Sequence, residues 1–229
     1  MPTNEFSQYM DQIVGQISEF LKPHGFKKRN RTFNRWTQDG LCQVFNLQMG
    51  IRSLYGEFTA NLGIFIPEVY RDMMNEEPPN FINEYECAIR ARFGEFTQTE
   101  DKWWEIAPYS SSIVEELIDL LQTYGLPFFI RFPDRQSIID HLLSFNEKYH
   151  VSNSPKLDIA LILENLGKHE DAIKMFNQHY RDSTNNKAHI EIVEKIAEKH
   201  NWKFQYYGDN KAHIEYLEKI AEKHNWSIQ

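Results

Sequence analysis

The sequence predicts an α+β fold, in which helices cover an antiparallel sheet and a small all-helical C-terminal domain follows. Three observations lead to this prediction: strand-like alternation over residues 42–65, a long amphipathic helical pattern over residues 4–22, and only helical patterns of any length beyond residue 148. We therefore expect two domains, an α+β domain at residues 1–148 and a helical region at residues 149–229.

The clearest strand pattern lies in residues 42–65. Apolar and polar residues alternate in CQVFNLQM and again in EFTANLGIF, and the turn-forming segment IRSLYG separates the two runs. Because alternate residues of a strand point to opposite faces, this pattern predicts an antiparallel hairpin with one buried face. The flanking helices are expected to cover that face.

The preceding residues supply one of these helices and a first strand. Residues 4–22 carry apolar side chains at helical spacing, and Pro23 and Gly25 are expected to end the helix. Residues 32–36 have the alternation of a strand, and Gln38-Asp39-Gly40 provides the turn into the hairpin.

After the hairpin the pattern becomes mixed. We expect a short helix at residues 67–74, a surface loop at residues 75–83 that contains Pro78 and Pro79, and strands at residues 86–96 and 102–106.

Two further helices complete the first domain. The helix predicted over residues 111–123 should stop at Gly125, with Pro127 just beyond it. The helix predicted over residues 135–146 has Asp134 as its N-cap.

The C-terminal region contains an internal repeat. Residues 156–180 read as two antiparallel helices joined at Gly167, which is similar to the turn of a tetratricopeptide hairpin. Residues 186–202 and 210–226 then match at 15 of 17 positions, 24 residues apart. Each copy predicts one amphipathic helix with an asparagine at its start.

Composition limits the classes of partner. The 229-residue chain has a net charge of −8, and residues 1–150 hold 14 Lys and Arg against 21 Asp and Glu, a net charge of −7. This balance argues against nucleic acid and anionic membranes as main partners, and it suits solubility or a basic partner. No stretch reads as a signal peptide or a membrane span. We expect a cytoplasmic protein in which Cys42 and Cys87 are free, with a Cys42–Cys87 disulfide as the less favoured alternative.

One candidate binding site combines arginine and tryptophan. Alternation places Arg90 and Arg92 on one strand face, and Trp103 and Trp104 follow closely. Arginines beside tryptophan can bind a carboxylate or phosphate ligand, or form part of a protein interface. The alternative is that they pair with glutamates on a polar sheet face, which stabilises a protein little; the candidates are Glu57, Glu95 and Glu105.

A second candidate site is basic. Lys27 and Lys28 begin a cluster that continues through Arg29, Arg31 and Arg35, beside Phe33 and Trp36. Such a cluster suits phosphate contacts with aromatic stacking in a nucleic-acid binder. The alternative is a solvated loop leading into an edge strand, where positive charge discourages aggregation.

No pattern predicts catalytic residues, a metal site or a cofactor. The histidine pairs of the repeat, His189 with His200 and His213 with His224, are 11 residues apart. That spacing is roughly 16 Å along a helix, too far for two ligands of one ion. Nucleotide-binding and nucleophile motifs are absent from the sequence.

Several segments together resemble a known family. FLKPHGFKKRNRTFNRW (20–36), VFNLQ (44–48), FTANLGIF (58–65), IRARFGEF (89–96), the Trp103-Trp104 pair and YGLPFFIRF (124–132) are similar, in this order, to an uncharacterised bacterial family, domain of unknown function 4304. The resemblance covers about residues 5–145. It implies an α+β fold, an intracellular setting and no established activity. Families of this kind are often encoded near secreted toxins, whose acidic partners are immunity proteins.

We therefore expect a non-enzymatic intracellular binding protein, of the immunity or adaptor kind, that acts through protein–protein contact. Its contact surface would be either the polar sheet face with Arg90, Arg92, Trp103 and Trp104, or its acidic surface. One alternative is a small anionic ligand-binding protein or enzyme that uses Arg90 and Arg92. The other is a nucleic-acid binder that uses Lys27–Arg35.

Overall fold

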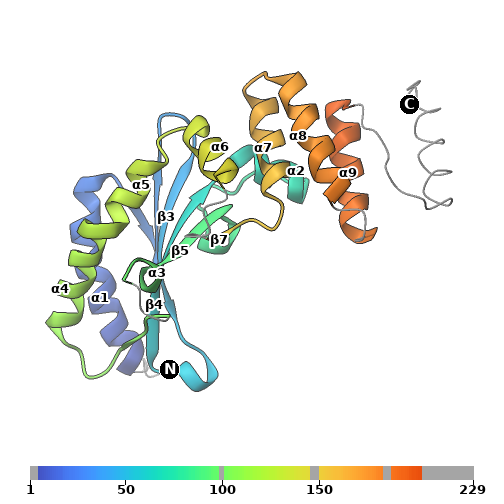
Figure 1. The fold of residues 1–229 in the computed structure, drawn as a ribbon. Coiled ribbons are helices and arrows are strands. Elements are labelled where there is room, and N and C mark those ends of the chain that lie inside the picture. The colour runs from blue at the N-terminus through green and yellow to red at the C-terminus, as the bar shows by residue number, and fades with distance from the viewer. Residues whose placement is uncertain (1–4, 98–100, 145–149, 183–186, 203–229) are drawn as a thin grey trace. The chain divides into compact units, whose positions relative to one another are not determined.

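The computed structural model describes residues 5–97, 101–144, 150–182 and 187–202 (Figure 1). The chain divides into two compact units, Met1–Tyr70 with Glu77–Ser152 and Arg71–Glu76 with Asn153–Gln229. One division falls inside helix α2, and another falls after Ser152, four residues beyond the predicted boundary. The second copy of the repeat, residues 210–226, lies outside the described residues.

The first unit contains an antiparallel sheet with helices beside it, so the predicted α+β class is confirmed. Neighbouring strands follow the order β1-β2-β3-β4-β5-β7, and β6 also pairs with β4. The strands are β1 (Lys27–Arg29), β2 (Thr32–Trp36), β3 (Cys42–Met49), β4 (Glu57–Phe65), β5 (Ile89–Arg92), β6 (Trp104–Glu105) and β7 (His150–Val151). The predicted hairpin is β3 and β4, with Cys42 opposite Phe65 and Met49 opposite Phe58.

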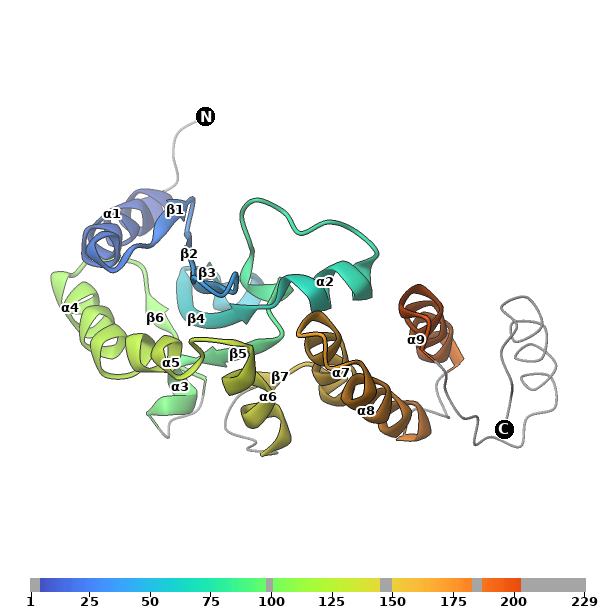
Figure 2. The same ribbon diagram turned by 90° about the horizontal axis from the view of Figure 1, so that it is seen from above.

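Helices cover one face of this sheet (Figure 2). They are α1 (Glu5–Leu21), α4 (Ser111–Leu120) and α5 (Leu126–Arg131). Helix α1 buries the side chains that its amphipathic pattern predicted; these are Met10, Ile13, Val14, Ile17 and Leu21. The sheet contributes its own apolar side chains to this core; among them are Phe33, Phe45, Leu47, Phe58, Leu62 and Ile89. We call this side of the sheet the core face.

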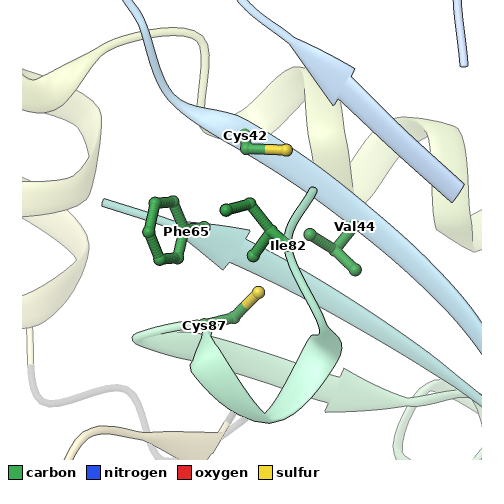
Figure 3. Close-up of a cluster of buried hydrophobic side chains, with 5 residues drawn as sticks. All are labelled: Cys42, Val44, Phe65, Ile82 and Cys87. Carbon is green, nitrogen blue, oxygen red and sulfur yellow. The ribbon is translucent and has the colours of Figure 1, made fainter. Parts of the chain in front are cut away.

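The sheet is wider and more buried than predicted. Strand β1 precedes the predicted first strand, and β4 is buried on both faces from Phe58 to Phe65. The prediction of a single buried face is therefore wrong for β4. On the second face a small apolar cluster forms (Figure 3); its members are Cys42, Val44, Phe65, Ile82 and Cys87. Ile82 belongs to the predicted surface loop at residues 75–83.

Both cysteines of this cluster are free and buried, as expected. Burial raises the pKa of Cys42 to about 12 and raises the pKa of Cys87 as well. A thiol with a raised pKa carries little thiolate, which is the reactive form. Cys42 and Cys87 therefore act as small apolar side chains.

The strand predicted at residues 86–96 is too long. Only Ile89–Arg92 is extended, and α3 (Phe93–Phe96) turns away from the sheet as one helical turn. The Glu95 carboxylate accepts the backbone N–H of Arg92 at 3.1 Å and caps this turn. Phe93 stays buried, with its ring 6.0 Å from that of Phe45. The alternation of buried and more exposed side chains therefore continues one residue beyond the end of the strand.

The predicted stop at Gly125 is also wrong. The chain continues from α4 through a π-helical turn, Leu121–Gly125, into α5. Gly125 keeps right-handed helical angles (φ −67°), and the wider turn lets Leu126 donate to the Leu121 carbonyl. Pro127 therefore sits at the start of a new helical segment, where its missing N–H is tolerated.

Other predicted elements are confirmed with small changes of boundary. Helix α2 covers Pro67–Met74 and α6 covers Arg135–Leu143. The Asp134 carboxylate caps α6 by accepting the backbone N–H of Ser137 at 2.9 Å.

The second unit is helical in its described residues. Helices α7 (Pro155–Asn165) and α8 (His169–Asp182) form the predicted hairpin, with Gly167 at φ +73° in the turn. Helix α9 (Lys187–His200) is the first copy of the repeat. The tetratricopeptide resemblance stays a prediction. Throughout the described part of the chain, no helix combines the length and the apolar character that a membrane crossing requires.

Candidate functional site: a polar sheet face and a basic edge strand

The side of the sheet opposite the core face carries polar side chains, and we call this side the polar face. Directly paired residues of neighbouring strands share a face. Thr32 pairs with Asn46, Asn46 with Asn61, and Asn61 with Arg92. The register therefore brings one polar side chain from each of four adjacent strands into a row.

These four side chains form a continuous hydrogen-bonded row. The Arg92 Nε donates to Asn61 Oδ1 at 3.1 Å, and Asn46 Nδ2 donates to the Thr32 hydroxyl at 2.8 Å. Asn61 Nδ2 lies 3.4 Å from Asn46 Oδ1 and 3.0 Å from Gln48 Oε1. Asn61 is 1% exposed, so its amide needs these partners. The primary role of this row is therefore structural.

One end of the polar face is covered by the segment before β5. Asn34 holds this segment through two hydrogen bonds, since its Nδ2 donates to the Ile82 carbonyl at 3.0 Å and its Oδ1 accepts the Ile82 N–H at 2.7 Å. Arg90 pairs with Glu84 at 2.5 Å in the same region. The covering segment hides part of the polar face from solvent.

The structure separates Trp104 from the other three residues of the predicted arginine–tryptophan site. Arg90 and Arg92 share the polar face as predicted, and the Arg92 guanidinium lies 5.9 Å from the centre of the Trp103 ring. Trp104 lies on the core face, where its ring stacks on Phe58 at 5.5 Å and its Nε1 donates to Glu116 at 2.9 Å.

Both arginines are already paired to carboxylates. Arg90 contacts Glu84, and Arg92 contacts Asp101, which also accepts the Trp103 Nε1–H at 3.2 Å. Neither carboxylate was among the predicted partners. Because a paired arginine must give up its partner to bind an anion, this arrangement weakens the proposal that Arg90 and Arg92 hold a ligand.

The basic cluster is divided between two environments. Arg35 lies against the core, 4.7 Å from the centre of the Phe26 ring, and burial lowers its pKa. Lys27, Lys28 and Arg29 form β1, the strand at one edge of the sheet, and all three are exposed. Among the described residues, none of these three side chains has an ion-pair or hydrogen-bond partner. They form a basic edge strand on an acidic domain.

A small cavity lies beside this edge strand on the polar face. Its volume is about 170 Å³, and it is lined by Arg29, Asn30, Thr32, Phe81 and Asn83. The Arg29 guanidinium lies 5.9 Å from the centre of the Phe81 ring, within the range of a cation–π contact. Asn30 has φ +53° in the turn between β1 and β2. The cavity thus presents one cation and several amide and hydroxyl groups.

Sequence reasoning identified the basic cluster but missed the cavity. Phe81 and Asn83 fall in the predicted surface loop, and nothing in the sequence places that loop over β2. The apolar pair Phe81-Ile82 within an acidic, proline-containing stretch was the available signal, since an exposed loop has little reason to carry two adjacent large apolar residues.

The described side chains form no metal-binding cluster. No three His, Cys, Asp or Glu side chains in the described ranges could hold a metal ion together. The cavity is lined by a single ionisable side chain, that of Arg29. A guanidinium stays protonated in proteins, so it can bind an anion but cannot serve as a general base.

Comparison with known protein families identifies the family of this chain. A family model described as "Domain of unknown function (DUF4304)" matches residues 17–131, half of the chain. Comparison with curated proteins gave no match, and comparison with solved structures gave none either. The matched range runs from the last turns of α1 through the sheet to α5, and it includes the basic edge strand and the cavity. The chain belongs to the DUF4304 family.

Proposed function

We propose that this protein is a non-enzymatic binding protein of the immunity or adaptor kind, which acts inside the cell through contact with another protein. The partner binds at the basic edge strand β1. One observation carries the proposal: Lys27, Lys28 and Arg29 are exposed and have no ion-pair or hydrogen-bond partner among the described residues, whereas Arg90 and Arg92 are paired to carboxylates.

An edge strand offers backbone N–H and C=O groups to another strand. Lysine and arginine on such a strand repel basic segments and attract acidic ones. An extended acidic segment can therefore add to β1 as a further strand, with backbone hydrogen bonds for affinity and side-chain contacts for specificity.

The cavity supplies one such side-chain contact. A volume of about 170 Å³ is small compared with the roughly 300–1,000 Å³ of typical small-molecule sites. It suits a single carboxylate side chain placed against Arg29, with the amides of Asn30 and Asn83 nearby. In this proposal Arg29 is the residue that selects an acidic partner.

Affinity capture from native lysate tests the proposal. The native chain should retain an acidic protein in stoichiometric amount, and Arg29→Glu should lose it. Lys22→Glu makes the same charge change at an exposed lysine outside β1, so it should retain the partner. Equal capture by Arg29→Glu, or the absence of any stoichiometric protein, would overturn the proposal.

The same cavity supports a second candidate, a free small anion such as a carboxylate or phosphate. It keeps the anionic-ligand alternative but moves the site from Arg90 and Arg92 to Arg29, since only Arg29 lines the cavity. Calorimetric titration with acetate and with phosphate distinguishes this candidate. Saturable binding that Arg29→Glu removes supports this candidate, and the absence of binding excludes it.

Nucleic acid stays the least favoured partner. Lys27, Lys28 and Arg29 offer three cations on β1, but residues 1–150 carry a net charge of −7. Retention on immobilised DNA at low salt, with a steep loss as salt rises, would reverse this ranking.

A further inference from the structure

Helix α9 is held in the second unit by contacts near its middle and at its C-terminal end. Near its middle, the Tyr180 hydroxyl donates to Glu194 Oε1 at 3.0 Å. After its last turn, the Trp202 Nε1–H donates to Glu164 Oε2 at 2.9 Å, and the Trp202 ring lies 5.0 Å from that of Phe176. Val193, Ala197 and Trp202 are 0% exposed.

A buried carboxylate fixes the C-terminal end of α9. Asp72, whose side chain is 7% exposed, pairs with Lys199 at 2.5 Å and with His200 Nε2 at 3.0 Å. We call the surface formed by Asp72, Glu164, Phe176 and Tyr180 the α9-binding face.

The residues that end α9 explain why Trp202 reaches this face. Asn201 adopts φ +54°, its N–H donates to the Glu198 carbonyl, and the N–H of Trp202 donates to the Ala197 carbonyl at 2.9 Å. This is the hydrogen-bond pattern of a Schellman C-cap, in which asparagine is a common residue at the left-handed position. The sequence His-Asn-Trp therefore favours a helix end at which the tryptophan side chain turns toward the α9-binding face.

Residues 210–226 repeat all of these side chains except Val193. The counterparts of the contacting side chains are Glu218, Ala221, Lys223, His224, Asn225 and Trp226. The copies differ at only two positions, where Ile192 corresponds to Tyr216 and Val193 to Leu217. Ile192 is 40% exposed, so tyrosine fits there without entering the interior. Leucine in place of the buried Val193 adds one methylene, which costs some packing strain.

We propose that residues 210–226 are a second occupant of the α9-binding face and exchange with α9 within the same chain. Each chain then has one face and two helices that fit it. One repeat completes the second unit while the other stays available for contact with a different molecule.

The lengths of the segments that connect α8 to the two copies determine which copy occupies the α9-binding face more of the time. Helix α9 follows α8 after four residues, 183–186, whereas the second copy would follow after the 28 residues 183–210. Loop closure alone then favours α9 by about 20-fold. A short tether gives effective concentrations in the millimolar range, so the same chain's copy outcompetes that of a second chain at ordinary protein concentrations.

Aspartate substitution in the two copies of the full chain tests the exchange. Ala197→Asp places a carboxylate at a fully buried position of α9, and Ala221→Asp is the matched change in the second copy. Ala221→Asp alone should leave thermal unfolding unchanged. Ala197→Asp should lower the melting temperature modestly, and the double variant should lower it by roughly 5 °C or more beyond that. If Ala197→Asp alone lowers it as far as the double variant, the proposal fails.

Cross-linking provides a direct readout. His179 Nε2 lies 2.8 Å from His189 Nε2, and His213 is the counterpart of His189. In the Ala197→Asp chain, His179→Cys and His213→Cys should be joined by a short bismaleimide within one chain. The same pair should react far less in the chain that keeps Ala197. Absence of the cross-link, or a cross-link only between chains, would overturn the intrachain exchange.

Discussion

Asn34, Asn46 and Asn61 show how single amides organise the first unit. Each lies in a strand interior, where asparagine is usually disfavoured, and each is held by partners on a neighbouring strand or on the segment before β5. Buried amides with satisfied hydrogen bonds fix register more strictly than apolar contacts do. The polar face therefore serves to align the strands, and β1 is the surface that we propose for binding.

Gly63 is a second position where one residue decides the packing. A Cβ built on Gly63 would lie 2.6 Å from Cys87 Sγ and 2.8 Å from Cys87 Cβ. We therefore expect Gly63→Ala to lower the free energy of unfolding by about 1–3 kcal/mol, measured by urea titration.

Gly15→Ala is the matched control, because a Cβ at that position of α1 meets nothing within 4 Å. It should stabilise the chain by about 0.5–1 kcal/mol, since glycine is a poor helix former. Equal effects at the two glycines would show that the Cys87 contact does not limit position 63.

Glu194 and His179 make the stability of the second unit depend on pH in opposite directions. Burial raises the pKa of Glu194 from 4.5 to about 7, so its contribution to stability is complete below pH 4.5 and is lost as pH rises through 7. Burial, together with His189, lowers the pKa of His179 from 6.5 to about 4, so its contribution is complete above pH 6.5 and is lost as pH falls through 4. Between pH 4.5 and pH 6.5 the pH dependences of these two contributions to the free energy of unfolding nearly cancel.

Glu194→Gln should reveal the pH dependence of stability that His179 causes. In this variant the free energy of unfolding should fall by up to about 1.4 kcal/mol per pH unit from pH 6.5 to 4.5, relative to the native chain. Thermal unfolding at a series of pH values measures the difference. A difference that does not change with pH would contradict the raised pKa of Glu194.

At the scale of elements, Asp134 is a cap whose contribution can be isolated. Its carboxylate accepts the Ser137 N–H at the start of α6. Asp134→Ala should cost about 1 kcal/mol of stability. Asp140→Ala removes the same charge from an exposed position of the same helix and should change stability by no more than about 0.5 kcal/mol. Chemical denaturation of both variants checks this, and equal losses would remove the capping interpretation.

Elements with a strong period were predictable, and those shaped by tertiary contacts were not. Helix α1 and the β3–β4 hairpin follow directly from spacing, because α1 and alternate residues of both strands place apolar side chains in the same core. Gly125 and Pro127 indicated a helix end, yet a π-helical turn absorbs both. Phe93 continues the alternation of β5, but the Glu95 cap makes its segment helical. Local hydrogen bonds decided these cases, and a residue pattern does not reveal them.

For the whole molecule, the fold class followed from the sequence more completely than the candidate site did. The covered antiparallel sheet was predictable from its hairpin and first helix. The sequence identified Arg90 and Arg92 as neighbours on one face, and the basic residues at 27–29 as a cluster. It could not show that Glu84 and Asp101 neutralise the first pair, because both pairings depend on how the segments just before and just after β5 fold back beside the strand.

The central claim is that β1, and not the paired arginines, is the binding surface of the first unit. The most direct measurement is an NMR titration of the ¹⁵N-labelled full chain with an extended peptide of alternating glutamate and threonine. The amide signals of Lys27, Lys28 and Arg29 should shift saturably, less at high salt, and not at all in Arg29→Glu, while Lys22→Glu should behave as the native chain does. Shifts centred on Arg90 and Arg92, or no saturable shift at β1, would contradict the claim.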